Sequence, residues 1–332
     1  MRAIVCDAFG STDALRLTPC EPPVPGPGEV CIRVAAAGLN FADILMVQGT
    51  YQETPAPPFI PGMEVAGEVV AVAPDVHRIA PGERVLAVVS KGGFAEQAVA
   101  RAGDVFALPP AMDDATAAGF PITYGTAHGA LVWRAGLRHG ETLLVHGAAG
   151  GAGLAAVEVG KALGARVIAT AGGAAKGELV RAHGADRVID HKSEDVRERV
   201  KDLTEGRGAD AVFDPVGGDI FDTSLRCTAW SGRLVVIGFA SGTVPQIPAN
   251  ILLVKNLSVL GLHWGAYRHH APALLQQQFV ELFRWYEAGL LHPHVGEFHD
   301  LAAATTALRR LQDRQAQGKV ILTTGTATGP AV

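Results

Sequence analysis

The hydrophobic pattern of the chain is most regular between residues 142 and 262. In this region short apolar runs alternate with segments whose apolar residues recur at helical spacing. The predicted strands are Thr142–Gly147, Arg166–Ala171, Arg187–Asp190, Ala209–Asp214, Gly232–Gly238 and Asn256–Leu262. The predicted helices are Gly151–Leu163, Ala174–His183, Ser193–Leu203 and Asp219–Thr228. Short apolar strands separated by amphipathic helices predict an α/β region, a doubly wound parallel sheet covered on both faces.

The first 120 residues follow a different pattern, because Pro and Gly interrupt them repeatedly. The short apolar runs between the interruptions are Val30–Ala36, Val65–Val72, Arg84–Val89 and Phe94–Val99. They predict an irregular, strand-rich domain. After about residue 265 the pattern predicts two helices, Leu274–Ala288 and Ala302–Leu311, and a last strand, Lys319–Thr323. We expect this tail to complete the first domain, which gives one domain of 1–120 with 265–332 and another of 121–264.

A glycine-rich turn follows the strand 142–147 directly. Its glycines have the spacing Gly-x-x-Gly-x-x-Gly, and a helical pattern begins at Leu154. Glycines allow a sharp turn and a close approach of the backbone, and the helix N-terminus directs N–H groups and partial positive charge at an anion. A turn with no ligand is the alternative for an isolated motif. The strands and helices downstream favour a dinucleotide-binding turn made by Gly147, Ala149, Gly150, Gly151, Ala152 and Gly153.

Composition and charge narrow the classes of partner. The 332 residues are 48% hydrophobic and carry a net charge of −5, with no cluster of Lys and Arg. Neither nucleic acid nor a membrane surface is therefore an expected partner. No apolar run approaches the ~20 residues of a membrane span, and the N-terminus is predicted to be a strand rather than a signal peptide. Four scattered cysteines indicate neither a disulfide framework nor a zinc site. We expect a cytoplasmic protein.

Several motifs, taken in chain order, carry a resemblance to a known family. They are Asn40-Phe41-Ala42-Asp43 before Gly49-Thr50-Tyr51, Pro61 to Gly67, Gly92 to Glu96, the glycine-rich turn, Asp214 to Gly218, and Arg314 near Gly318-Lys319. Over almost its whole length the chain resembles the zinc-independent quinone oxidoreductases of the medium-chain dehydrogenase/reductase superfamily. The resemblance implies a GroES-like, irregular β-rich catalytic domain, a Rossmann cofactor domain, NADPH as the cofactor, and a homodimer paired through the edges of the Rossmann sheets.

Two substitutions argue against zinc chemistry. Zinc-dependent members of the superfamily bind the metal through a Cys in a Cys-x-x-Asp motif and a His in a Gly-His-Glu motif. Asn40 and Met63 stand at the matching positions here, and residues 119–126 contain no Cys, His, Asp or Glu. An amide and a thioether are poor ligands for zinc. We expect no metal, and reduction of an acceptor that is already electrophilic.

The choice of cofactor depends on the end of the second strand of the α/β region. The sequence from Thr170 to Gly173 has no acid to hold a ribose 2′-OH, so a 2′-phosphate is permitted there. By the resemblance, Lys176 and Arg314 match cations at the adenosine end, and His191 replaces a Tyr that is frequent in the family. A solvated residue at a helix start is the alternative for Lys176. The other cofactor-binding residues that the resemblance implies are Thr123, Thr170, Gly172, Gly217, Phe239, Ala240 and His263, although packing at the hinge is an alternative for several of them.

The candidate catalytic residues lie in the first domain. Hydride transfer needs donors that stabilise the developing oxyanion of the acceptor, and the amide of Asn40 and the phenol of Tyr51 can both donate. Asp43 either orients this network or caps a helix N-terminus. The leading hypothesis is reduction of a quinone. Reduction of the C=C bond of an enone, an enal or an unsaturated thioester is an alternative, and so is an NADPH-binding regulatory or structural protein with little turnover.

Overall fold

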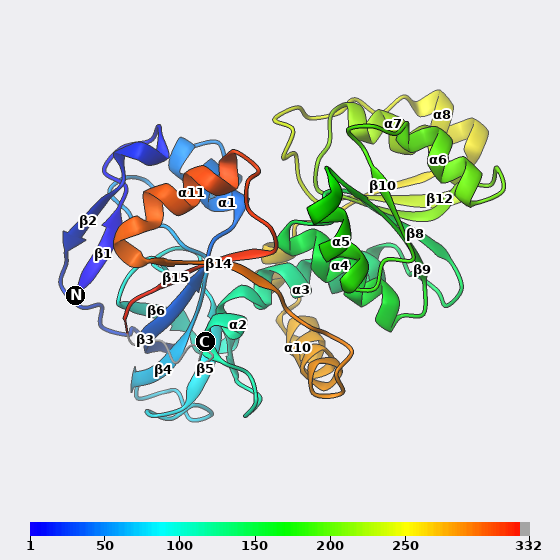
Figure 1. Ribbon diagram of the computed structural model, residues 1–332. Coiled ribbons are helices and arrows are strands. Elements are labelled where there is room, and N and C mark those ends of the chain that lie inside the picture. The colour runs from blue at the N-terminus through cyan, green and yellow to red at the C-terminus, as the bar shows by residue number, and fades with distance from the viewer. Residues whose placement is uncertain (326–332) are drawn as a thin grey trace. The chain divides into compact units, whose positions relative to one another are not determined.

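The structure is a computed structural model that describes residues 1–325. The chain forms two compact units (Figure 1). Unit 1 consists of Met1–Ile122 together with the segment that starts at His294, and unit 2 consists of Thr123–Pro293.

Unit 2 is built on a six-stranded parallel sheet of order β10-β9-β8-β11-β12-β13. Its strands are β8 (Thr142–Val145), β9 (Arg166–Ala171), β10 (Arg187–Asp190), β11 (Ala209–Asp214), β12 (Thr228–Val236) and β13 (Ser258–Gly261). Chain order reverses between β8 and β11, which is the switch point of a doubly wound sheet. The predicted fold class of this region is confirmed.

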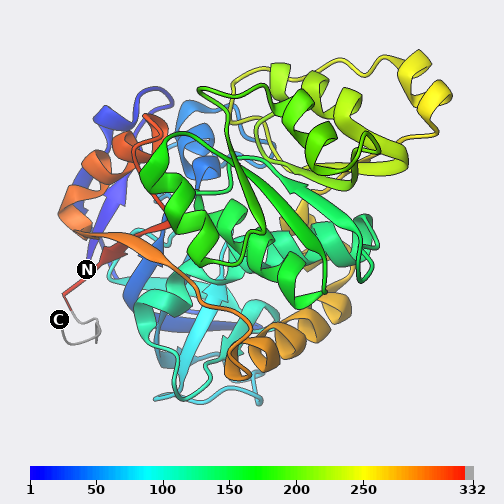
Figure 2. The same cartoon turned by 45° about the vertical axis from the view of Figure 1, so that its right-hand side comes forward.

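The helices between the strands cover both faces of this sheet (Figures 1 and 2). They are α4 (Gly151–Ala162), α5 (Ala174–Ala182), α6 (Val196–Leu203), α7 (Asp219–Cys227) and α8 (Ala249–Lys255). The helices α4 and α5 pack on the strands from β8 to β10, whereas α6 and α7 pack together on the other side. There Val200, Phe221 and Leu225 share a buried cluster with Ile168 and Val212 of the sheet. The helical periodicity therefore reflects one buried face on each helix.

A second helical group belongs to unit 2 as well. It consists of α3 (Pro121–His128), a π-helix η3 (Gly129–Arg134), η4 (Trp264–Ala266), α9 (Tyr267–His270) and α10 (Pro272–Glu287). The indole N–H of Trp264 donates to Gln278 Oε1 at 2.9 Å, and Gln278 Nε2 donates to the carbonyl of Gly125 at 2.9 Å. These buried bonds keep α10 in unit 2. The second unit therefore ends at Pro293, beyond the predicted boundary at 264.

Unit 1 is the irregular, strand-rich part. Its main sheet has the order β14-β15-β3-β4-β5-β7, β6 also pairs with β3, and β1 pairs with β2. The strands are β1 (Arg2–Val5), β2 (Arg16–Pro19), β3 (Glu29–Gly38), β4 (Glu64–Val72), β5 (Arg84–Val88), β6 (Gln97–Arg101), β7 (Val105–Ala107), β14 (Val295–Asp300) and β15 (Lys319–Thr323). The helices are α1 (Phe41–Gln48), α2 (Asp114–Gly119) and α11 (Ala304–Gln312), with short 3₁₀ turns η1 (Thr12–Ala14), η2 (Ala102–Asp104) and η5 (Leu301–Ala303). The strand β15 pairs with β3, so the part of the predicted tail that starts at His294 belongs to this unit, whereas residues 265–293 belong to unit 2.

Candidate functional site

The glycine-rich turn of unit 2 joins the end of β8 to the start of α4. Gly147 has a left-handed φ of 58°, which favours glycine. A Cβ on Gly153 would lie 2.3 Å from the carbonyl oxygen of Gly147, so only glycine fits where the helix meets the turn. The turn contains all six predicted residues, Gly147, Ala149, Gly150, Gly151, Ala152 and Gly153. The first amides of α4 therefore lie at the switch point, in an arrangement that is able to hold an anion.

A group of basic side chains lies at the ends of β9 and β10. A Cβ on Gly172 would lie 3.1 Å from His191 Nε2 and 2.9 Å from Lys192 Cε, so both side chains lie against this glycine. Burial and then the neighbouring charge of Lys192 lower the pKa of Lys176 on α5. We call Lys176, His191 and Lys192 the basic cluster. Sequence reasoning missed Lys192, because its contact with Gly172 depends on the pairing of β9 with β10.

Two polar residues near the basic cluster face other partners. Asp190 accepts the N–H groups of Gly173 at 3.1 Å and Lys192 at 3.0 Å through Oδ1, and these backbone bonds help to lower the pKa of Asp190. Thr170 is buried, and its hydroxyl lies 3.2 Å from His146 Nδ1 in the interior. The carboxylate of Asp190 is therefore held by the backbone. The hydroxyl of the predicted Thr170 lies in the interior, and its carbonyl accepts the N–H of Ala148 at 3.1 Å.

The ends of β11, β12 and β13 bring further predicted residues to the same edge of the sheet. A Cβ on Gly217 would lie 3.0 Å from Phe239 Cδ1, and the N–H of Ala240 donates to the carbonyl of Pro215 at 3.1 Å. His263 follows β13 and is exposed. Because all six strands are parallel, their carboxyl ends and the glycine-rich turn share one edge. Thr123 stands apart from these strand ends in sequence, in α3, and is buried.

A buried histidine supports the glycine-rich turn from inside. His146 lies between the end of β8 and Gly147, and its Nε2 is 2.8 Å from the hydroxyl of Ser224 on α7. Burial lowers the pKa of His146 to about 4, so the ring is neutral at neutral pH. Sequence reasoning did not single out this residue, since a lone His in an apolar strand carries no distinctive spacing.

A buried carboxylate on α4 was also missed. Glu158 is 2% exposed, and its Oε2 accepts the hydroxyl of Tyr124 at 2.6 Å and the N–H of His292 at 2.8 Å. Its Oε1 pairs with Nδ1 of His183. Burial and then the charge of Glu158 raise the pKa of Tyr124 well above its usual range. Glu158 thus connects α4 to segments near both ends of unit 2.

Unit 1 holds a second candidate site, which we call the Asn40 cluster: Asn40, Asp43, Glu64 and Lys319. Asn40 caps the N-terminus of α1, and its N–H donates to Asp43 Oδ2 at 2.7 Å. This is the capping contact expected as one alternative for Asp43. Asp43 is completely buried, and burial raises the pKa of its carboxyl to about 7, although the Asn40 N–H and the Lys319 charge act in the opposite direction.

The side-chain amide of Asn40 is held between opposite charges. Its Nδ2 donates to Glu64 Oε1 at 2.8 Å, and its Oδ1 accepts from Lys319 Nζ at 2.7 Å. Glu64 and Lys319 also form an ion pair, with their side chains 0% and 7% exposed. Glu64 Oε2 accepts the N–H of Ile122 at 2.9 Å, a first-turn amide of α3. Glu64 and Lys319 had no predicted role, because they come from strands far apart in sequence.

The remaining predicted residues of unit 1 lie in loops. Tyr51 follows α1 and packs on the unit 1 core, and burial raises the pKa of its phenol, with smaller contributions from Glu53 and Asp43. The phenol therefore keeps its proton at neutral pH. Arg314 lies in the loop between α11 and β15, is exposed, and has a left-handed φ of 58°. Met63, which the resemblance matches to a zinc ligand of zinc-dependent members, directly precedes Glu64 in the sequence and is buried.

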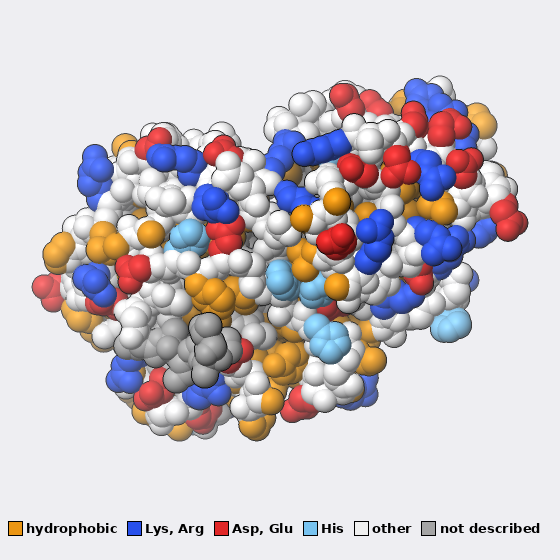
Figure 3. Space-filling view, in the orientation of Figure 1, with side chains coloured by type: hydrophobic (Ala, Val, Ile, Leu, Met, Phe, Trp, Pro, Cys, Tyr) orange, Lys and Arg blue, Asp and Glu red, His pale blue; other side chains and the backbone are white. Residues whose placement is uncertain are grey.

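Charged side chains of both signs are visible on one face of the molecule (Figure 3). On the face shown in Figure 3, basic and acidic side chains are interspersed rather than gathered into one extended field. No helix within residues 1–325 is both long enough and apolar enough to cross a membrane. In the same residues no three His, Cys, Asp or Glu side chains gather as ligands for a metal ion.

Comparison with known proteins identifies the family. A family model described as "Alcohol dehydrogenase GroES-like domain" matches residues 26–110, and one described as "Zinc-binding dehydrogenase" matches residues 151–281. The chain is 41% identical to quinone oxidoreductase-like protein 2 homolog of Nematostella vectensis, over 97% of this chain and 89% of that protein.

Solved structures agree with these matches. The quinone oxidoreductase of Escherichia coli complexed with NADPH is similar with a TM-score of 0.90 and 30% identity, over 97% of this chain and 100% of that one. The CurK enoyl reductase is similar with a TM-score of 0.89 and 28% identity, over 97% and 98% of the two chains. The chain belongs to the zinc-independent quinone oxidoreductase branch of the medium-chain dehydrogenase/reductase superfamily.

Proposed function

We propose that the protein is an NADPH-dependent reductase whose acceptor is a quinone. The observation that carries this proposal is the glycine-rich turn at the switch point, with the basic cluster at the neighbouring strand ends. A turn of this kind fits a pyrophosphate, and cations at the end of β9, where an NAD site usually has an acid, fit a 2′-phosphate. The similar E. coli quinone oxidoreductase, which was solved with NADPH, supports the same assignment.

The predicted cofactor-binding residues of unit 2 each have a proposed task toward NADPH. The first amides of α4 would hold the pyrophosphate, and Lys176 and His191 would bind the 2′-phosphate, with Arg314 of unit 1 as a further cation. Gly172 and Gly217 would let neighbouring side chains of the site, His191 and Phe239, lie close to the backbone on which the cofactor would bind. The remaining contacts that we propose are from Thr123, Thr170, Phe239, Ala240 and His263. When bound, NADPH supplies a hydride.

The residues of unit 1 have proposed tasks toward the acceptor. Asn40 and Tyr51 would donate hydrogen bonds to the quinone oxygen as negative charge develops on it. The hydride adds two electrons to the quinone, and Tyr51 would deliver a proton to the oxygen, directly or through water. Asp43 fixes the start of α1, and thereby the backbone of Asn40, through its 2.7 Å contact.

Reduction of a conjugated C=C bond is the second candidate, and the similarity to an enoyl reductase favours it. Both reactions need a hydride donor beside an electrophilic carbon and a donor to the carbonyl oxygen. The site chemistry described above therefore serves either acceptor.

The test is NADPH oxidation, followed by absorbance, with 1,4-benzoquinone, 9,10-phenanthrenequinone and a simple enone, and with NADH in parallel. We expect turnover of a quinone that is faster with NADPH than with NADH. Turnover of the enone alone would replace the quinone by an alkene as acceptor. Saturable NADPH binding without any turnover would contradict a reductase and favour a regulatory or structural role. The Tyr51→Phe variant is the matched comparison, since unchanged turnover would remove Tyr51 from the reaction.

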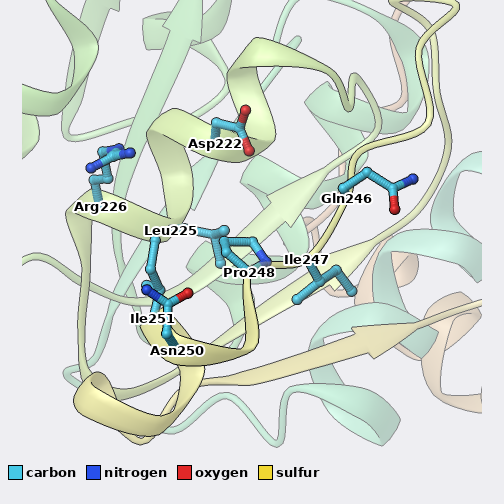
Figure 4. A pocket seen from close by; sticks show the side chains of 8 residues that line it. All are labelled: Asp222, Leu225, Arg226, Gln246, Ile247, Pro248, Asn250 and Ile251. Carbon is cyan, nitrogen blue, oxygen red and sulfur yellow. The ribbon is translucent and has the colours of Figure 1, made fainter.

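We also propose that two copies of the chain pair through unit 2. The strand β13 is the edge strand of the six-stranded sheet, so one side of its backbone has no neighbouring strand in that sheet. Nearby, α8 exposes Leu253 and Val254, which are 78% and 76% accessible. A pocket of about 410 Å³ lies between α7 and the start of α8, and its lining ends at Ile251, two residues before Leu253 (Figure 4). A two-fold axis would bring such an edge against its own copy.

Light scattering tests the pairing. We expect the mass of a dimer for the wild-type protein and of a monomer for Leu253→Asp/Val254→Asp. A monomeric wild type at assay concentration would contradict the proposal. The exposed Val24 of unit 1, replaced by Asp, is the matched control and should leave the mass unchanged.

A further inference from the structure

The Asn40 cluster contains more polar machinery than a helix cap needs. In the capping box of α1 the backbone N–H of Asn40 donates to Asp43, and the Asn40 side chain meets the backbone of Asp43. Beyond this cap, the side-chain amide of Asn40 is also fixed by a buried carboxylate and a buried ammonium group from two other strands. A buried ion pair is not by itself a source of stability, because desolvation offsets the attraction between the charges. Stability alone therefore does not explain why the Glu64–Lys319 ion pair is arranged around the Asn40 amide.

The chemistry of the two partners fixes which way the amide faces. An ammonium group has only donors, so the atom that Lys319 contacts at 2.7 Å must be the amide oxygen. An ionised carboxylate has only acceptors, so the atom that Glu64 contacts at 2.8 Å must be the amide nitrogen. The reversed amide would place its N–H donors against the Lys319 donors and its oxygen against the Glu64 oxygen. Within residues 1–325 the further acceptor near the Asn40 amide nitrogen is the Gly38 carbonyl, at 3.5 Å, which is the limit of a hydrogen bond.

The fold reserves space for this arrangement. The pairing of β15 with β3 matches Ile321 with Gly38, and the same register, continued by two residues, sets Lys319 opposite Asn40. A Cβ on Gly38 would lie 2.5 Å from Glu64 Oε1, and a Cβ on Gly119 would lie 2.7 Å from Lys319 Cγ. Two glycines on separate elements thus leave room for the carboxylate and for the lysine stem.

We propose that Lys319 and Glu64 are positioning residues, which orient the Asn40 amide so that its second N–H serves as the donor to the acceptor oxygen. Lys319 draws electron density toward the amide oxygen, and this strengthens the N–H groups as donors. The donor thereby gains strength while Asn40 itself stays uncharged. This inference rests on the proposed reductase function, and it assigns a task to two residues that act through Asn40.

A double-mutant cycle tests whether Lys319 acts through Asn40. We expect Lys319→Met to lower kcat for the quinone by about ten-fold or more, and Lys319→Arg to restore part of it. In the Asn40→Ala background, Lys319→Met is expected to change kcat by less than about two-fold, because the amide is already gone. An equal loss in both backgrounds would overturn the proposal. The affinity for NADPH should stay within about two-fold of wild type throughout.

Two controls separate positioning from loss of structure. Arg84→Met removes the cation of another ion pair of unit 1, that with Asp114, and should leave kcat unchanged. If Lys319→Met alone does not fold, the double variant Glu64→Gln/Lys319→Met leaves no uncompensated buried charge. It is expected to show the same loss of kcat, and a wild-type kcat in this variant would overturn the proposal.

A measurement without turnover keeps the inference distinct from the proposed reaction. The sequence contains three asparagines, Asn40, Asn250 and Asn256, so selective ¹⁵N labelling gives three side-chain amide signals. Asn250 and Asn256 are exposed and serve as internal references. We expect the Asn40 amide protons to exchange with water more slowly than both, and Lys319→Met to remove that difference. Equal exchange in the wild type would overturn the fixed orientation, whereas a fixed amide in a protein that reduces no acceptor would overturn the reductase and the catalytic use of the amide.

Discussion

The two candidate sites are built in opposite ways. In unit 2 the glycine-rich turn is one continuous stretch, and backbone geometry at Gly147 and Gly153 determines its shape. In unit 1 the Asn40 cluster combines side chains from the start of α1, the start of β4 and the start of β15. Asn40 and Lys319 are 279 positions apart in sequence. The first site is local and depends on backbone, whereas the second is assembled by the tertiary fold and depends on side chains.

Because of this difference, the two sites tolerate different kinds of substitution. The turn depends on glycine at Gly147 and Gly153, so a Cβ added at either position harms its geometry. The Asn40 cluster depends on buried charges, so it responds to pH and to the loss of any one partner. The following predictions act on one side of this comparison at a time.

The largest effect is expected from Gly153→Val. The new side chain would collide with the Gly147 carbonyl, at 2.3 Å from the Cβ position, and would distort the turn. We expect the affinity for NADPH to fall by roughly 100-fold or more, as measured by calorimetric titration. Gly150→Ala is the control for folding, because its Cβ would have only the Gly147 oxygen at 3.5 Å and its φ is −84°. Wild-type affinity in Gly153→Val would show that the turn does not hold the cofactor.

A smaller effect, confined to unit 1, is expected from Asp43→Asn. The folded protein binds the Asp43 proton with a pKa of about 7, whereas an unfolded Asp has a pKa near ~3.9. The contribution of this carboxyl to stability is therefore greatest below pH ~4 and is lost as the pH rises to about 7. Relative to wild type, the Asn variant should gain roughly 2 to 3 kcal/mol of unfolding free energy between pH 5 and pH 8.

Denaturant titrations at the two pH values measure this change. Asp7→Asn, at an exposed position, is the control and should show no such trend. A difference between Asp43→Asn and wild type that is independent of pH would mean that Asp43 stays ionised when buried.

The smallest effect is expected from Lys176→Met, which sharpens the assignment of the basic cluster. Removing one cation should weaken NADPH binding by about ten-fold and leave NADH binding nearly unchanged, because NADH has no 2′-phosphate. Fluorescence titration with both nucleotides measures the ratio. Lys201→Met on α6 is the matched control. An equal loss for NADPH and NADH would place Lys176 away from the 2′-phosphate.

The contrast between local and assembled structure also explains which helices and strands could be predicted from the sequence. The strands β9, β10 and β11 and the strand β15 have the predicted bounds, because each is a short apolar run with clear ends. The helix α1 was anticipated only through the capping alternative for Asp43, since its eight residues are mostly apolar and show no separate apolar face. The strand β14 was missed as well, because alternation of exposed and half-buried positions gives it no apolar run.

Prediction of the site followed the same rule. The glycine-rich turn could be located from local spacing, and its residues do lie together. Lys192, Glu64 and Lys319 could not be assigned, because each acquires its role from strand pairing. The domain boundary at 264 was placed too early for the same reason, since Gln278 joins α10 to Gly125 across 153 positions.

The carboxylate of Glu158 has a consequence for the modularity of the chain. The chain enters unit 2 at Thr123 and leaves it at Pro293, and the adjacent Tyr124 and His292 both donate to the same oxygen, Glu158 Oε2. The two ends of the unit are therefore tied to one point on α4. A segment with neighbouring ends can be excised, circularly permuted or exchanged between chains with a short connecting peptide. Residues 123–293 thus form a unit that could be exchanged between homologous proteins as one segment. The two hydrogen bonds to Glu158 would hold the ends of that segment together.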